Sequence, residues 1–131
     1  MNNKLVLIGG SITLLLAICL GAFGAHGLEG KISADAINSY KTGVDYQIYH
    51  GLAILLLVII GKQFDLKLRW AVRFIFIGVI LFSGSIYLLA LKTLFGIESF
   101  AHILGPITPI GGLSFIIGWC IVIMALFKVS K

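Results

Sequence analysis

Four long apolar runs, separated by short polar segments, dominate the pattern of this chain. They cover residues 5–23, 44–61, 71–91 and 109–127. A helix needs about 20 apolar residues to cross roughly 30 Å of bilayer hydrocarbon, so the second run is short unless the polar segment 42–47 continues its helix outward. A transmembrane barrel would show alternating positions, which these runs lack. The pattern predicts an all-α integral membrane four-helix bundle forming a single transmembrane domain over residues 1–131.

Local signals at the ends of the runs refine these predicted helices. Ser33 is placed to cap a short interfacial helix over 34–41 in the first outer loop. Thr108 is placed to cap the fourth helix, with Pro109 at its first position, where the missing N–H has no helical partner to lose. The apolar core of the first run exceeds the roughly 7–15 residues of a signal peptide, so a retained helix is expected.

Composition and charge agree with a membrane protein and predict its orientation. Hydrophobic residues make up 60% of the chain and charged residues 11%, whereas a soluble domain is about a quarter charged. With the N-terminus inside, the inner segments hold seven of the ten Lys and Arg residues: Lys4, Lys62, Lys67, Arg69, Arg73, Lys128 and Lys131. The outer loops hold Lys31, Lys41 and Lys92. The positive-inside rule therefore predicts cytoplasmic N- and C-termini in the cell membrane, with the lipid bilayer as partner.

Several functional classes lack their sequence signatures. No basic stripe with interleaved aromatic residues is present, so no nucleic-acid partner is expected. The chain has no serine nucleophile elbow, HExxH, CxxC or phosphate loop. Its cysteines, Cys19 and Cys120, lie inside apolar runs without partners at metal-ligand spacing. We therefore predict that the protein is not an enzyme, with no catalytic residue and no cofactor.

His50 is the best candidate for chemistry because it is an ionisable residue within an apolar run. Tyr46 and Gln47 precede it by about one helical turn and lie on nearby faces. The candidate polar or ligand site comprises His26, Asp45, Tyr46, Gln47 and His50, with Glu98 as a further acid on the outer side. Within it, His26, His50, Asp45 and Glu98 are the residues that could together bind a metal ion or relay protons. The interpretation we favour is that His50 hydrogen-bonds a neighbouring helix or backbone and specifies packing; His102 is expected at the surface.

Small residues recur at helical spacing inside the runs. Gly78 and Ser85 are seven residues apart, as are Gly111 and Gly118, and Ser83 and Gly84 lie beside Ser85. In lipid, small residues let helix backbones approach closely, and hydroxyl groups hydrogen-bond across helices. The pattern favours tight packing and self-association over the alternative of a pore or hinge.

Four sequence blocks resemble a known family. They are Leu20–Leu28 (LGAFGAHGL), Thr42–His50 (TGVDYQIYH), Leu81–Tyr87 (LFSGSIY), and Ile107–Gly112 (ITPIGG) followed by Gly118–Trp119. In this order they resemble domain-of-unknown-function family 423, small four-helix membrane proteins of bacteria with animal relatives. The resemblance covers nearly the whole chain and implies a staphylococcal-type, membrane-stabilising member of a family whose proteins are linked to membrane integrity. It implies no reaction.

The resemblance also implies which residues belong to the family pattern, namely His26, Gln47, His50, Ser83, Tyr87, Thr108 and Pro109, but not His102. Together with the small-residue pattern, it assigns helix packing to Gly21, Gly24, Gly78, Ser83, Gly84, Ser85, Tyr87, Thr108, Pro109, Gly111, Gly112 and Gly118. The first functional hypothesis is a non-enzymatic membrane protein that supports membrane or envelope integrity as a homo-oligomer. The alternatives are a small channel or transporter subunit, or a metal- or haem-binding membrane protein using His26 and His50.

Overall fold

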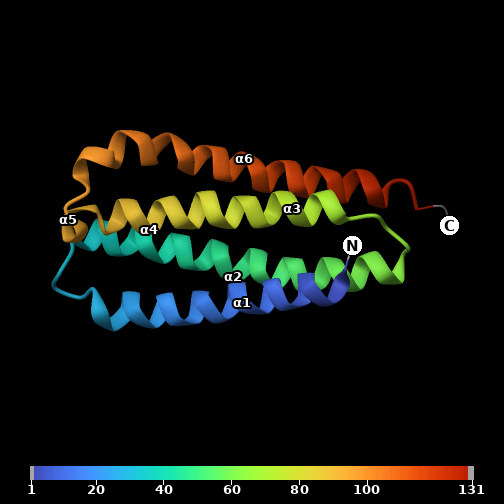
Figure 1. The fold of residues 1–131 in the computed structure, drawn as a ribbon, viewed down its shortest axis with the longest axis horizontal. Helices are drawn as coiled ribbons and strands as arrows, with labels where there is room; N and C mark the ends of the chain where they lie inside the picture. Colours follow the sequence, from blue (N-terminus) through green and yellow to red (C-terminus); the bar gives the residue numbers. More distant parts are fainter. Residues whose placement is uncertain (1, 130–131) are drawn as a thin grey trace.

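The structure is a computed structural model that describes residues 2–129, and this part of the chain contains helices and no strand (Figure 1). The elements are α1 (Asn3–Ala22), the π-helical turn η1 (Phe23–Gly27), α2 (Ala34–Gln63), α3 (Arg69–Gly78), the π-helical turn η2 (Val79–Ser83), α4 (Gly84–Ala90), α5 (Lys92–Phe95), the 3-10 turn η3 (Glu98–Phe100) and α6 (Ala101–Leu126). Four helical segments are long and apolar enough to cross a membrane: Asn3–Gly27, Ala34–Gln63, Arg69–Ala90 and Glu98–Leu126. The predicted all-α membrane fold is confirmed.

The second span is one uninterrupted helix, α2, that begins well before the apolar run. The Ser33 hydroxyl caps it by accepting a hydrogen bond from the Ala36 backbone N–H at 3.2 Å. The prediction of a separate short interfacial helix is therefore wrong, because residues 34–41 are the first turns of α2. The polar segment 42–47 does continue the helix outward, because its polar side chains can remain hydrated or bond other helices while the backbone stays helical.

The α-helix of the fourth span, α6, begins at Ala101, about two turns before the predicted start. Both prolines, Pro106 and Pro109, lie inside α6, so Thr108 is not its N-terminal cap. Membrane helices tolerate proline when neighbouring groups satisfy the polar atoms that it frees. The Thr108 hydroxyl lies 2.7 Å from the Ser85 hydroxyl on α4 and so joins two helices. The capping prediction is wrong because a proline in the sequence does not distinguish the first turn of a helix from the interior of a membrane helix.

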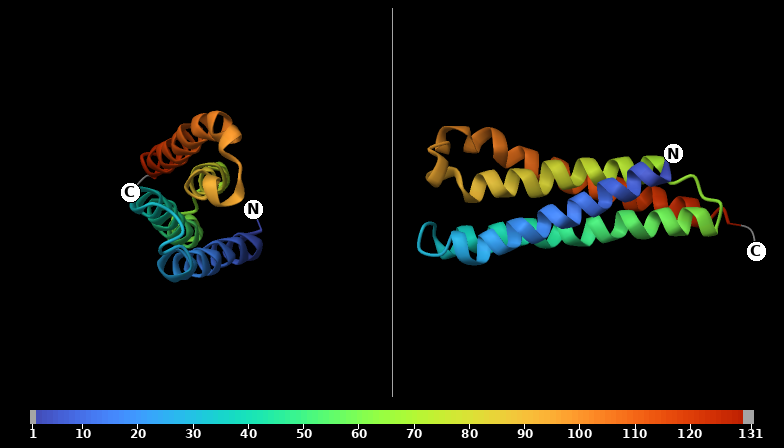
Figure 2. Two further views of the ribbon diagram at one scale, coloured as in Figure 1. Left: turned by 90° about the vertical axis from the view of Figure 1, so that its left-hand side faces the viewer. Right: turned by 60° about the horizontal axis from the view of Figure 1, so that its bottom comes forward.

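The four spans pack in the order of the chain, each mainly on the spans before and after it, as the end-on view in Figure 2 shows. The first span packs on α2, α2 packs on η2 and α4, and the third span packs on α6. Consequently α1 and α6 lie at the two ends of this packing order (Figure 1). The start of α1 and the end of α6 lie at the same end of the bundle as the turn between α2 and α3 (Figure 1).

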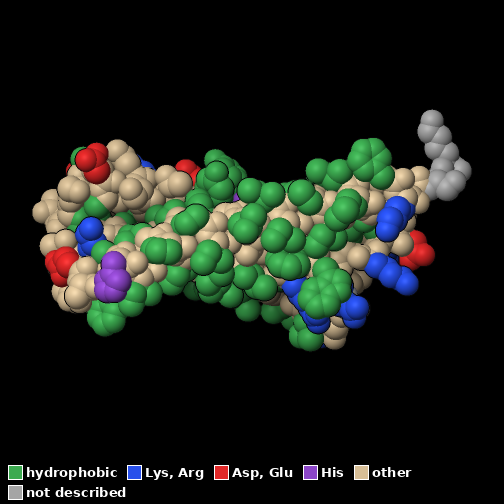
Figure 3. Space-filling view, turned by 90° about the horizontal axis from the view of Figure 1, so that it is seen from above, with side chains coloured by type: hydrophobic (Ala, Val, Ile, Leu, Met, Phe, Trp, Pro, Cys, Tyr) green, Lys and Arg blue, Asp and Glu red, His purple; other side chains and the backbone are tan. Residues whose placement is uncertain are grey.

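Two apolar clusters hold the spans together. The larger one joins α2, α3, η2 and α6 through Ile54, Leu57, Leu68, Ala71, Val72, Ile75, Val79, Phe115 and Val122. The smaller one lies near the segment that connects η1 to α2 and contains Leu28, Tyr40, Val44, Ala90 and Leu91. Figure 3 shows apolar side chains along the middle of the molecule and charged ones at its two ends. This distribution is the one that a bilayer requires of a spanning protein.

Candidate functional site

A chain of hydrogen bonds links three of the four spans through Gln47. This side chain is only 5% exposed, and its Nε2 donates to the backbone carbonyl of Thr13 on α1 at 2.9 Å. Its Oε1 accepts a hydrogen bond from the Tyr87 hydroxyl on α4 at 2.8 Å. One amide therefore uses both of its ends between helices, which is the arrangement that a buried polar group in lipid needs.

Tyr40 extends this polar network toward the C-terminal end of α1. Its hydroxyl donates to the backbone carbonyl of Leu20 at 3.1 Å, and its ring lies 4.8 Å from that of Tyr87. Gly24 makes room for it, because a Cβ atom at this position would lie 2.7 Å from the Tyr40 ring. The first span is thus joined to α2 by two side chains that bond its backbone.

His50 belongs to a different cluster, between α2 and α6. Its Nδ1 lies 2.8 Å from the Tyr46 carbonyl oxygen, which can only accept, so Nδ1 carries the proton. Its Nε2 is then an acceptor and receives the indole N–H of Trp119 at 3.4 Å. The imidazole stacks on Phe115 with ring centroids 3.6 Å apart. These contacts fit the neutral tautomer and place the ring firmly against α6.

The depth of His50 follows from its place on α2. It precedes Lys62 by about three turns, which is roughly 18 Å at 1.5 Å per residue. With Lys62 at the membrane surface, His50 lies near the centre of a hydrocarbon layer that is roughly 30 Å thick. A polar group at this depth needs a protein partner, since acyl chains offer no hydrogen bond.

His26 and His50 do not come together. The bond between Gln47 and Thr13 places His50 near the level of Thr13 on α1, and His26 lies about 20 Å further along that span at the helical rise. His26 and Asp45 are exposed. Within residues 2–129, no group of three or more His, Cys, Asp or Glu side chains is close enough to hold a metal ion. The structure therefore divides the candidate set into interhelical contacts and exposed residues.

An open groove of about 700 Å³ lies beside His50, between α2 and α6. Its lining includes Tyr46, Phe82, Phe115 and Trp119 and carries no Lys, Arg, Asp or Glu. Sequence reasoning did not select Phe115 or Trp119 as partners of His50. Their spacing of four residues does indicate that both side chains lie on one face of a helix. The spacing does not indicate which helix that face packs against.

The glycines assigned to packing differ in what surrounds them. A Cβ atom on Gly111 would collide with the backbone of Phe82, and one on Gly78 would collide with the Phe115 ring. One on Gly118 would lie 2.9 Å from Ile75, and one on Gly21 would lie 3.3 Å from Val44. These four positions allow helices to approach closely.

Two other positions do not fit the packing assignment as closely. Gly112 is in ordinary contact, 3.8 Å from the Phe82 ring. Gly84 has no atom of another helix within 4 Å of its Cβ position, so its assignment to packing within the chain is wrong. Its neighbour Ser85 bonds Thr108, whereas the Ser83 hydroxyl is fully buried without a hydrogen-bond partner among the described residues. Adjacent small residues thus face in different directions.

Comparison with known proteins identifies the family. Residues 20–112 match the family described as "Protein of unknown function (DUF423)". This chain belongs to the DUF423 family. A UPF0382 membrane protein of Staphylococcus aureus (strain bovine RF122) is 45% identical over 125 residues, covering 95% of this chain and 97% of the relative. UPF0382 membrane proteins of Staphylococcus haemolyticus and Staphylococcus saprophyticus are 43% and 40% identical, covering 95% and 96% of this chain and 97% and 99% of the relatives.

No solved structure matches this DUF423 chain significantly. These relatives are named membrane proteins, and the similarity to this chain extends over almost their full length. The DUF423 chain is therefore a multi-pass membrane protein of an uncharacterised family, and no enzymatic family is indicated.

Proposed function

We propose that this DUF423 protein is a non-enzymatic membrane protein that supports membrane or envelope integrity through self-association. The observation that carries the proposal is the use of polar side chains within the spans. Gln47, Tyr87 and His50 all bond or stack on another helix. Groups engaged in this way define the register of helices and are not free to act on a substrate.

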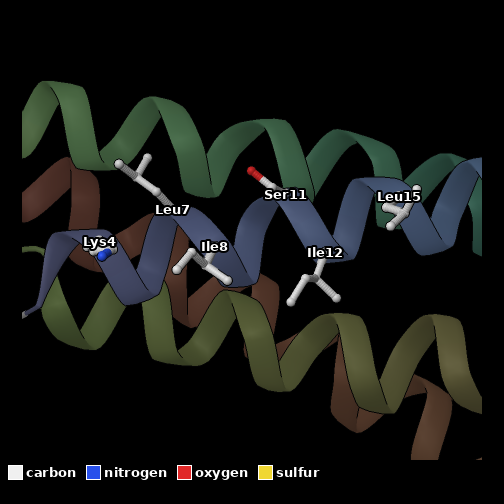
Figure 4. A pocket seen from close by; sticks show the side chains of 6 residues that line it. All are labelled: Lys4, Leu7, Ile8, Ser11, Ile12 and Leu15. Atoms are coloured by element: carbon white, nitrogen blue, oxygen red, sulfur yellow. The ribbon is translucent and has the colours of Figure 1, made fainter.

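The exposed side of α1, which packs on no other helix of the chain, supports contact with a second copy. The most apolar window of the first span is 17% buried, against 28–50% for the other three. Figure 4 shows part of this face, where Ser11 lies among apolar side chains of α1. The shallow pocket on this face is lined by Lys4, Leu7, Ile8, Ser11, Ile12 and Leu15, all labelled in Figure 4. A small residue with a hydroxyl group suits a helix–helix contact better than acyl chains, which offer no hydrogen-bond partner.

The alternatives receive less support from the geometry. A metal or haem site using His26 and His50 would need the two side chains to meet, and they lie about 20 Å apart along the bundle. A channel would need a polar path across the membrane. The groove beside His50 opens sideways between α2 and α6 and has a mainly apolar lining.

Crosslinking in vesicles tests self-association. In a variant with both native cysteines replaced by serine, we expect Ser11→Cys to form a disulfide-linked dimer under mild oxidation at low protein-to-lipid ratio. The matched control is Ile110→Cys, which places a cysteine on the exposed side of α6 (54% exposed). Equal crosslinking at the two positions would mean random collision and would refute an α1 contact.

A dye-leakage assay in cells tests the proposed role in membrane integrity. Ser11→Trp adds bulk on an exposed face without entering the core, so it should separate copies while leaving each one folded. Cells lacking their own copy should leak an impermeant dye when given Ser11→Trp and resist leakage when given the parent or Ile110→Trp. If Ser11→Trp protects as well as the parent, the proposed function does not depend on this contact.

A further inference from the structure

The turn between α2 and α3 borders a second cavity, at the end of the bundle where α1 begins and α6 ends. Its volume is about 720 Å³. Its apolar floor consists of Leu57, Val58 and Leu68, which are almost fully buried. Its rim is polar and includes Lys62, Asp65, Lys67 and Arg69. An apolar floor below a charged rim is complementary to an amphiphile.

The rim has an excess of positive charge. Lys62, Lys67 and Arg69 contribute three positive charges and Asp65 one negative charge, so the net charge is +2. All four side chains are exposed. Figure 3 shows Lys and Arg side chains gathered at this end of the molecule. The positive-inside rule accounts for basic residues near a span, but not for their convergence on a cavity with an apolar floor.

The backbone of the turn also adds positive charge to the rim, through the start of the third span. The Leu66 N–H donates to the Gly61 carbonyl at 2.9 Å, and Asp65 has a positive φ of 50°, which closes the chain tightly on the end of α2. The third span begins at Arg69 without a side-chain cap. The positive end of its helix dipole therefore adds to the positive charge of the rim.

Trp70 marks the depth of the rim. Its ring lines the same cavity and is 54% exposed, and the Arg73 guanidinium lies 4.7 Å from the ring centroid. Tryptophan beside basic residues is typical of the level of the lipid headgroups. A headgroup phosphate at this level would lie close to the basic side chains, with its acyl chain extending past the exposed Trp70 ring.

We propose that this cavity binds the headgroup of an anionic phospholipid from the leaflet at this end of the bundle. Lys62, Lys67 and Arg69 attract the phosphate, and the exposed ring of Trp70 lies beside the upper part of one acyl chain. Basic pockets beside membrane helices recognise anionic lipids in this way. The inference concerns a different surface from the α1 contact and does not depend on self-association.

Fluorescence quenching tests the lipid site. The chain has two tryptophans, so Trp119→Phe leaves Trp70 as the only reporter. The protein is reconstituted in phosphatidylcholine vesicles with traces of brominated phosphatidylglycerol or brominated phosphatidylcholine. We expect brominated phosphatidylglycerol to quench Trp70 at a mole fraction at least five-fold lower, since each basic residue at the surface raises affinity for anionic lipid by about five-fold. Equal quenching by the two lipids would overturn the proposal.

Two charge variants sharpen the result. Lys62→Gln with Lys67→Gln and Arg69→Gln should abolish the preference, whereas Lys62→Arg with Lys67→Arg should retain it. The matched control, Lys31→Gln with Lys41→Gln and Lys92→Gln, removes three positive charges at the opposite end and should have no effect. A preference that survives the first triple, or disappears with the control triple, would overturn the site. Loss of the preference in millimolar inorganic phosphate would show a free-anion site and overturn the assignment to lipid.

Discussion

Gly111 and Gly84 offer a direct test of the helix packing, because both are span glycines that the sequence treats alike. A methyl group on Gly111 would meet the backbone of Phe82 on the neighbouring span, where no side-chain rotation can relieve the contact. A methyl group on Gly84 would meet no other helix. Overpacking a core costs about 1–3 kcal/mol, while alanine gains about 0.5–1 kcal/mol over glycine within a helix.

We therefore expect Gly111→Ala to lower the free energy of unfolding by about 1–2 kcal/mol. Gly84→Ala should leave it unchanged or raise it by up to about 1 kcal/mol. The measurement is reversible unfolding in mixed micelles, followed by the loss of helical circular dichroism as the denaturing detergent increases. If both variants unfold at the same point, the close approach of α6 to the third span is wrong.

Three further outcomes are expected. Tyr87→Phe should lower the free energy of unfolding by about 1 kcal/mol, because it leaves a buried amide oxygen on α2 unpaired; no change in micelle unfolding would argue against that bond. His50→Ala should destabilise by about 1–2 kcal/mol more than His102→Ala, which alters an exposed side chain; stability retained with lost ligand binding or flux would instead favour a chemical role. In a cysteine-free background, an impermeant thiol reagent applied to cells should label Ser33→Cys and not Lys67→Cys, and the opposite pattern would reverse the predicted topology.

The candidate site shows where sequence reasoning stops. The chain indicates that Gln47 and His50 are polar residues within a span, and hence that each requires a partner. It does not indicate that Gln47 reaches Thr13 and Tyr87, or that His50 turns away from His26 toward Trp119. Those pairings depend on the rotation and register of four helices, to which many weak contacts contribute.

The sequence by itself determined four membrane helices, because a backbone in lipid must satisfy its own hydrogen bonds and an apolar run of sufficient length does so only as a helix. That requirement is local and can be read residue by residue. The tertiary structure decided that α2 starts at Ala34, that α6 passes through both prolines, and that Gly111 is packed while Gly84 is open. These outcomes depend on surfaces from separate spans, since lipid is as apolar as the side chains and only shape and a few hydrogen bonds select one arrangement over another.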